Sequence, residues 1–281
     1  MKYYLSMSLV VFIFPIAVFG ASIVIAPETP VQGDPLMIQI DGLSGTTTMQ
    51  SMSFAGKPLS TFIYGGRPTA FYGIDLRKAP GIYRIVARLS DGTSINREIV
   101  IGSKEKYVAV FTIPAKLGGN ATSSQKALVS RLAIENASLE NIWTGKKAFW
   151  TEPFRYPLAL PVVTDTYGYV RKTGATTIAH KGADFRASIG TDVYAMNRGV
   201  VRMVRSYQDY GKTIIVDHGL GLMTFYMHLS KIFVEEGQLV LRGQVMGQSG
   251  DTGYAESPHL HITMRIGGIS IDPVRFMELF K

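Results

Sequence analysis

The chain has 281 residues, 46% of them hydrophobic, so it can bury a substantial core and is not an intrinsically disordered chain. It contains no cysteine, which excludes disulfides and thiolate ligands, and any metal site must therefore use nitrogen and oxygen atoms. The formal net charge of +8 favours an acidic partner, such as an anionic lipid or cell-wall polymer; a solvated basic surface explains it equally well, and no basic run or motif indicates nucleic acid.

Residues 1–20 are typical of a secretory signal peptide. Lys2 precedes an apolar stretch that continues to Phe19, and small residues then fit a cleavage site before Ala21. An uncleaved membrane anchor is the alternative, because this stretch lies at the lower length limit for a membrane span. Pro15 and the small residues favour cleavage. We therefore expect a secreted or periplasmic protein that meets a membrane only in transit or through an uncleaved anchor.

Residues 21–103 show short alternating apolar runs that are separated by turn residues. Strands at this spacing, without a helical pattern, predict a small immunoglobulin-like β-sandwich. This part of the chain has no histidine and no cluster of acidic residues, so we expect it to bind or to act as a spacer. The runs are Ser22–Ile25, Leu36–Ile40, Ile82–Ala87 and Arg97–Ile101.

Residues 104–150 are predicted to be a linker with one helix. Leu128, Leu132 and Leu139 recur at helical spacing, which predicts a helix from Ser123 to Trp143 with a serine at its N-cap.

Residues 151–281 are again rich in strand patterns, which glycines interrupt. No βαβ unit is visible, so the pattern predicts an antiparallel sheet and makes the whole chain mainly β. The predicted strands are 200–204, Thr213–Val216, Leu222–Leu229, Leu239–Leu241 and Leu260–Ile266.

The last of these strands places two histidines on one face. Successive side chains of a strand point to opposite sides, so His259, His261, Thr263 and Arg265 share a polar face. The residues between them are apolar and are expected to face the core.

The strand Leu222–Leu229 is predicted to bring a third histidine to the same place. Alternation puts Met223, Phe225 and Met227 on an apolar face, and it puts His228 with Leu222, Thr224 and Tyr226 on the other face. If this second face lies beside that of His259 and His261, the three imidazoles meet.

His180 and Asp184 form a further pair, four residues apart. In a helix or in a strand this spacing keeps both side chains on one side, and Gly182 lets the backbone approach a metal closely. Two imidazoles and a carboxylate suit Zn²⁺ at a catalytic site, where water takes the open position. His218 stands at a strand end before a turn, and we expect it to have a structural role.

From Pro157 to Pro273 the chain resembles the lysostaphin-type (LytM-like) zinc metallopeptidases, which cleave peptide bonds in peptidoglycan cross-bridges or stems. The motifs stand in the family's order with ordinary spacings. They are Ala179–Arg186, Gly190-Thr191, Val193–Ala195, Gly199–Val201, Val216–Gly219, Tyr226–Ser230, Gly250–Gly253, Pro258–His261 and Asp272-Pro273.

The resemblance implies a site and a mechanism. His180, Asp184 and His261 are the expected zinc ligands, and His228 and His259 the expected catalytic pair that does not bind the metal. In such a site zinc polarises the scissile carbonyl and acidifies a bound water. One free imidazole then takes the proton of that water, and the other orients water or stabilises charge. Which histidine does which stays open, and the expected substrate is a peptidoglycan peptide.

Two positions depart from the family pattern, and the milder change is Tyr167, which stands before Gly168 in place of the common phenylalanine. Ser257 replaces the glycine that usually precedes the Pro-His-x-His motif, and Glu256 stands beside it, so we expect an altered substrate groove. All five site positions are kept, which favours an enzyme over the alternative, a non-catalytic envelope protein that binds peptidoglycan or regulates a hydrolase. The linker precedes the catalytic domain, and we expect that it covers the groove and holds the enzyme latent.

Overall fold

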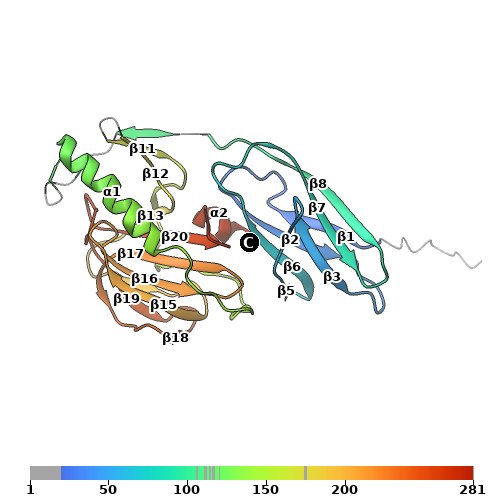
Figure 1. Cartoon of the computed structure of the whole chain (residues 1–281). Coiled ribbons are helices and arrows are strands. Elements are labelled where there is room, and N and C mark those ends of the chain that lie inside the picture. The colour runs from blue at the N-terminus through green and yellow to red at the C-terminus, as the bar shows by residue number, and fades with distance from the viewer. Residues whose placement is uncertain are drawn as a thin grey trace, which may run out of the picture.

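The computed structural model describes residues 20–105, 107–110, 113, 115, 118–119, 121–173 and 176–280. Apart from Gly20, the predicted signal peptide lies outside these residues. Figure 1 shows an N-terminal β-sandwich, drawn in blue to cyan, beside a C-terminal β-domain, drawn in yellow to red, with the helix α1 lying along the C-terminal domain. None of the helices in the described part of the chain has the length and apolar character needed to span a membrane.

The N-terminal part consists of two four-stranded antiparallel sheets. Both sheets contribute to one hydrophobic core, in which Ile25 and Ile38 of the first sheet lie with Phe54 and Ile85 of the second. The first sheet has the order β1 (Ser22–Ala26), β2 (Pro35–Asp41), β6 (Arg67–Gly73) and β5 (Thr61–Tyr64), and the second has the order β4 (Lys57–Pro58), β3 (Met49–Phe54), β7 (Gly81–Leu89) and β8 (Ser94–Ile101). The immunoglobulin-like assignment of this sandwich stays a prediction, which the strand order favours.

The connecting segment contains strand β9 (Val108–Val110) and helix α1 (Thr122–Ser138). The helix is shorter at its C-terminus than the pattern predicted. The prediction of a serine N-cap is wrong, because Ala121 holds that position and no side chain caps the helix. The hydroxyl of Ser124 instead donates to the Gly118 carbonyl over 2.9 Å. After α1, Leu139 is buried against the C-terminal domain and Trp150 lies in its main core, so this part of the linker packs as part of that domain.

The C-terminal domain is built on a large antiparallel sheet, as the strand patterns predicted. Its strand order is β10 (Val163–Asp165), β13 (Ala183–Arg186), β20 (His259–Ile266), β17 (Leu222–Ile232), β16 (Lys212–Asp217), β15 (Gly199–Ser206) and β18 (Leu239–Val240). Strand β14 (Asp192–Tyr194) pairs with β19 (Val245–Ser249), which pairs with β17, and β21 (Ile269–Ile271) pairs with β20. A smaller sheet joins β9 to β11 (Val170–Thr173) and β12 (Thr176–Ala179).

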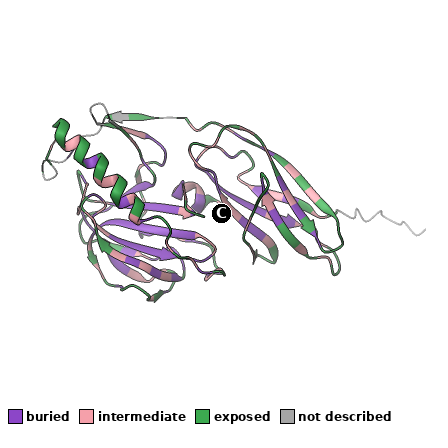
Figure 2. Ribbon diagram, viewed as in Figure 1, coloured by how far each residue is buried: buried purple, intermediate pink, exposed green. Residues whose placement is uncertain are grey.

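The two faces of the large sheet differ. Ile262 and Met264 of β20 point into the main core, whereas Phe225 and Met227 of β17 belong to a smaller cluster on the opposite face. Figure 2 shows the central strands of this sheet buried along most of their length. The short helix α2 (Pro273–Glu278) closes the domain, and the side chain of Asp272 caps it by accepting from the backbone of Val274 and Arg275.

An aromatic cluster joins the two domains. Phe71 of the sandwich stacks on Trp150, with ring centroids 6.0 Å apart, and contacts Phe276 of α2 at 5.5 Å. Tyr64 lies edge-on to Phe280 at 5.7 Å. Aromatic pairs at these separations add to the free energy of burying the rings, so the contact favours one arrangement of the domains.

Candidate metal centre and active site

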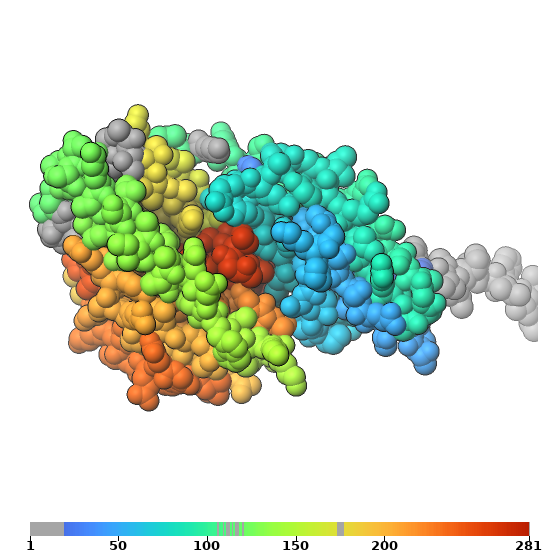
Figure 3. Space-filling model, in the orientation of Figure 1, coloured from blue at the N-terminus to red at the C-terminus, as the bar shows by residue number. Residues whose placement is uncertain are grey.

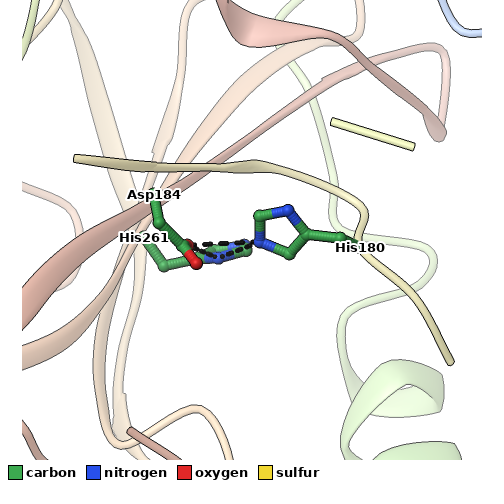
Figure 4. A group of neighbouring side chains, drawn as sticks. All are labelled: His180, Asp184 and His261. Atoms are coloured by element: carbon green, nitrogen blue, oxygen red, sulfur yellow. Dashed lines mark hydrogen bonds and ion pairs between the residues drawn. The ribbon is translucent and has the colours of Figure 1, made fainter. Parts of the chain in front are cut away.

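Two neighbouring strands bring the three predicted metal ligands together. His180 follows β12, Asp184 lies in β13, and His261 lies in β20 directly opposite Asp184. Directly opposed residues of an antiparallel pair point to the same side of the sheet. All three side chains are almost completely buried, and Figure 4 shows their polar atoms turned toward one another.

Two of the three distances between the polar atoms are close to those around a tetrahedral ion. His261 Nδ1 lies 2.6 Å from Asp184 Oδ1, and His180 Nε2 lies 3.2 Å from the same oxygen and 3.1 Å from His261 Nδ1. Ligand atoms that bind zinc at about 2.0–2.1 Å with tetrahedral angles lie about 3.3 Å apart. The residues therefore present three converging donors of the kinds that zinc binds.

Hydrogen bonds behind the histidines select the tautomers that a metal requires. His180 Nδ1 donates to the carbonyl of Thr166 over 2.9 Å, which leaves the Nε2 lone pair for the metal. His261 Nε2 donates to the hydroxyl of Thr263 over 3.0 Å, and that hydroxyl donates in turn to the carbonyl of Lys181 over 3.0 Å. The lone pair of His261 therefore lies on Nδ1, which faces the other two ligands.

Asp184 is held as a carboxylate. Burial raises its pKa, but the imidazoles of His261 and His180 outweigh this and hold the pKa well below its usual range. Its second oxygen, Oδ2, accepts from Arg171 Nη2 over 2.7 Å, so Oδ1 stays available to a metal. Burial lowers the pKa of His261 to about 4, against the opposing effect of Asp184, so His261 is neutral at pH 7. Deprotonated carboxylate and neutral imidazole are the forms that bind metal.

Gly182 permits the close approach of β13 to β20. A side chain at this position would place its Cβ 2.4 Å from His261 Nε2 and 2.4 Å from the carbonyl oxygen of Ile262. The backbone passes so near to a ligand histidine that only glycine fits, as the sequence indicated.

The two histidines predicted to act without binding metal lie beside this centre. The rings of His228 and His259 have centroids 4.8 Å apart, and His259 Nε2 lies 3.8 Å from Asp184 Oδ1. Each Nδ1 donates to a backbone carbonyl, from His228 to Thr252 and from His259 to Ser257, both over 2.8 Å. Both residues therefore keep an Nε2 lone pair that can accept a proton.

His228 reaches this side of the sheet by a route that alternation does not predict. Met227 pairs with His261, so the metal-ligand face of the sheet is the face of β17 that carries Met227. The prediction put His228 on the other face, with Leu222, Thr224 and Tyr226, and it is wrong because His228 lies on the same side as His261. The register of β17 against β16 slips by one residue near Thr213, and His228 has a left-handed φ of 61°. This β-bulge turns the imidazole to the face of the metal ligands.

Burial also affects the protonation of His228. It lowers the pKa of this imidazole well below its ordinary value, and the nearby His259 and His261 add to the effect. His228 is therefore neutral at pH 7 and can act as a base.

His218 has the structural role that the sequence predicted. It is fully buried on the opposite side of the domain, where its Nδ1 bonds to the Arg198 carbonyl and its Nε2 to the Thr224 hydroxyl, both over 2.9 Å. Burial lowers its pKa to about 4.

Two cavities flank the centre. One, of about 300 Å³, is lined by His228, His261 and residues of α1 such as Leu132. The other, of about 270 Å³, lies on the side of His259 and is lined by polar and charged residues. Together they can accommodate a chain that passes over the three ligands on both sides.

Sequence reasoning missed Arg171 and Thr263 as partners of the ligands. Arg171 comes from β11, a strand that the pattern did not reveal, and no local motif marks it. The signal for Thr263 was present, because it follows His261 at an interval of two on the same face of one strand.

Comparison with known proteins gives evidence, in addition to the geometry of the site, on the family that the C-terminal domain resembles. Residues 178–273 match the model of peptidase family M23. The peptidoglycan DD-endopeptidase ShyA of Vibrio cholerae is 44% identical over 96 residues, which cover 34% of this chain and 22% of that protein. Stage II sporulation protein Q of Bacillus subtilis is 29% identical over 170 residues, which cover 57% of this chain and 58% of that protein.

A solved structure resembles most of the chain. A crystal structure described as a putative peptidase M23 from Pseudomonas aeruginosa superimposes with a TM-score of 0.57 at 28% identity, covering 90% of this chain and 96% of that one. The similarity to it therefore extends beyond the C-terminal domain. In contrast, this chain spans only 20–30% of the length of the first five curated relatives.

Proposed function

We propose that the C-terminal domain, a peptidase family M23 domain over residues 178–273, is a zinc-dependent endopeptidase that hydrolyses peptide bonds of peptidoglycan. The observation that carries this proposal is the joint placement, at one groove, of three converging metal donors and two imidazoles with free Nε2 atoms. The relatives from Vibrio cholerae are named as peptidoglycan DD-endopeptidases, which supports the choice of substrate.

His180, Asp184 and His261 would hold the zinc ion, which when bound supplies a Lewis acid for the scissile carbonyl and lowers the pKa of water. The rest of the chemistry belongs to His228 and His259. Each has its Nδ1 bonded to a backbone carbonyl, so each imidazole in its neutral form can accept the proton of the attacking water at Nε2. The resulting imidazolium can return that proton to the leaving amine or stabilise the negative charge that develops on the carbonyl oxygen.

The chain's other properties agree with action in the cell envelope. Its net charge of +8 suits an anionic polymer, and the pattern of residues 1–20 suits export, so we propose a secreted or periplasmic location. The non-catalytic alternative gains no support from the site, because all five residues are present in a geometry suited to chemistry. We also propose that the sandwich is an immunoglobulin-like spacer that the aromatic cluster fixes to the catalytic domain.

The direct test is digestion of purified peptidoglycan sacculi by the full chain loaded with zinc. We expect peptide-cleaved fragments to be released, the release to stop when a zinc chelator is added, and mass spectrometry to identify the bond. The same amount of release with and without chelator would rule out metal-dependent hydrolysis. No release from protein that contains one zinc per chain would favour a binding protein or a latent enzyme.

Helix α1 supports the proposal that the linker controls the site. Val129, Leu132, Ala133 and Asn136 form one wall of the cavity of about 300 Å³ that leads to His228. Figure 3 shows the helix, drawn in green, lying across the surface of the C-terminal domain. A peptide that enters from this side must pass beneath α1 or displace it, so we propose that α1 restricts access to the groove.

Two residues of α1 anchor it to the loop before β16. The buried carboxylate of Glu135 accepts from three successive backbone N–H groups, those of Gln208, Asp209 and Tyr210, over 2.8–3.1 Å. Arg131 pairs with buried Asp209 over 3.0 Å. Charged acceptors that receive several hydrogen bonds hold strongly, so Glu135 is the anchor whose removal should release the helix.

Glu135→Ala in the full chain should therefore increase hydrolysis of sacculi several-fold, by about 5- to 12-fold for a loss of about 1–1.5 kcal/mol of docking free energy. The matched control is Ile134→Ala, which changes an exposed side chain of the same helix and should leave the rate unchanged. Faster hydrogen exchange of residues 122–138 in Glu135→Ala would show that the helix was released. A slower reaction would overturn the proposal and indicate support of the site through Tyr210, whose carbonyl accepts from the backbone N–H of His228.

A further inference from the structure

The cavity on the side of His259 is lined by charged residues in addition to those of the hydrolytic site. It measures about 270 Å³, and its lining includes no residue of α1. Its lining consists of Thr164, Asp165, Arg171, Asp184, Arg186, Tyr254, Glu256, Ser257, Pro258 and His259. A substrate chain that crosses the metal ligands must place one of its residues here.

Arg186 stands on the same face of the sheet as the ligands. It lies in β13 two residues after Asp184 and directly opposite His259 of β20. Residues two apart in a strand point to one side and are about 6.8 Å apart along it. The same spacing separates alternate residues of an extended peptide, so Arg186 lies about two residues from the bond that the centre would cleave.

The two arginines of this cavity differ in their partners. The guanidinium of Arg171 is largely buried and pairs with Asp184 over 2.7 Å and with Asp165 over 3.6 Å. Arg186 is exposed to solvent, and its guanidinium has no hydrogen bond or ion pair with any residue that the structure describes. Arg171 is therefore committed to the protein, and Arg186 is available to a ligand.

Two of the three acids in the cavity are also committed. Asp184 serves the metal centre, and Asp165 accepts from the Tyr169 hydroxyl over 3.0 Å in addition to its pairing with Arg171. The third acid, Glu256, is exposed in the loop before Pro258 but also has an interaction partner in the protein. Arg186 is therefore the cation of this lining whose guanidinium has no ion pair or hydrogen bond with the residues that the structure describes.

We infer that Arg186 binds a carboxylate of the substrate peptide, on the His259 side of the scissile bond, and so determines specificity for an acidic peptide. This inference rests on the proposed function for the identity of the substrate. A guanidinium binds a carboxylate through two parallel hydrogen bonds, which gives direction as well as charge. The carboxylate is either the C-terminus of the peptide or an acidic side chain, since both offer the same chemistry.

The test compares Arg186→Gln and Arg186→Lys with the parent chain, all loaded with zinc, on peptides that differ only in one carboxylate. Each peptide is made in the free acid and the carboxamide form, once at the C-terminus and once at a side chain. At one of the two positions, the C-terminus or the side chain, the parent chain should bind and cleave the free-acid peptide at least about tenfold better than the carboxamide peptide. About tenfold is the effect expected from the loss of one charge-assisted hydrogen bond. Arg186→Gln should reduce this ratio to near one, and Arg186→Lys should keep part of it.

Arg205→Gln is the control for net charge, because Arg205 is exposed in β15 of the same domain and lies outside both cavities. It should keep the ratio of the parent chain, and all variants should keep one zinc per chain. A ratio near one in the parent chain at both positions, or a ratio unchanged in Arg186→Gln, would overturn the inference. The acid-to-amide ratio is also measured by equilibrium binding, so it decides the role of Arg186 even if no peptide is cleaved. The absence of cleavage would contradict the proposed function and leave the inference about Arg186 to the binding ratio.

Discussion

His261→Ala should leave the purified protein with less than about 0.1 zinc ion per chain after dialysis, and peptide hydrolysis should fall by more than about 100-fold. The remaining donors, His180 and Asp184, cannot hold zinc in the three-ligand geometry of a catalytic site. Metal content measured by atomic spectroscopy, together with the rate of fragment release from sacculi, checks both parts of this result.

Thr263→Ala is the matched control for His261→Ala. It removes only the hydroxyl that fixes the His261 tautomer, so zinc affinity should fall by about 10- to 100-fold, and activity should return at saturating zinc. A full complement of zinc in His261→Ala, with a thermal unfolding transition like that of the parent chain, would contradict the assignment of the ligands. Asp184→Ala is the less informative choice, because it also leaves the largely buried guanidinium of Arg171 without its 2.7 Å partner.

The grouping of three histidines with one carboxylate could be expected from the sequence, because local spacing places each pair on one side of its segment. His261 and His259 share a face because alternate residues of one strand point to the same side. His180 and Asp184 are four residues apart, a spacing that keeps both side chains on one side of a helix or of a strand. The register of β13 against β20, in which Asp184 lies opposite His261, brings these two pairs of residues together. Gly182 lies where the backbone passes close to His261. Resemblance to a known family supplied the division of roles, which spacing alone left open.

The route of His228 could not be predicted, because a β-bulge depends on the partner strand. Apolar and polar residues alternate along β17 as far as Met227. This pattern does not reveal the extra residue opposite Thr213, which turns the side chain of His228 to the other face. The prediction that His228 lies near His259 agrees with the structure, although the face of the strand from which it was predicted is wrong. Its left-handed φ of 61° is uncommon for a residue other than glycine, and the surrounding structure maintains it.

Contacts between distant segments, like the β-bulge, could not be predicted from the sequence. The helical spacing of α1 predicted a helix, but only the fold shows that Glu135 docks on residues 208–210 and that the helix forms one wall of the groove. In the sandwich, the apolar runs predicted β1, β2, β7 and β8. They missed β3 to β6, which are short or interrupted by glycine and polar residues, so alternation alone does not reveal them.

His228→Ala and His228→Asn should keep one zinc per chain and reduce the turnover of peptide by about 10²- to 10⁴-fold, the usual contribution of a general acid–base group. His228 donates its Nδ1 proton to Thr252, and its ring centroid lies 6.0 Å from that of His261, so its loss should spare the ligands. Asparagine is included because it tolerates the left-handed backbone at this position better than alanine does. Agreement between the two variants therefore separates the loss of the imidazole from a change in the bulge.

Metal content, turnover and KM of the two His228 variants decide the division of roles. Full zinc with a fall in kcat, and little change in KM, assigns His228 to the chemical step. Hydrolysis retained within a few-fold of the parent chain would make His259 the sole acid–base residue, since it alone among the remaining histidines has a free Nε2 facing the centre, 3.8 Å from Asp184. Loss of zinc in both variants would instead assign the bulge at His228 to the support of the ligands, and the base would then have to be sought in His259→Ala.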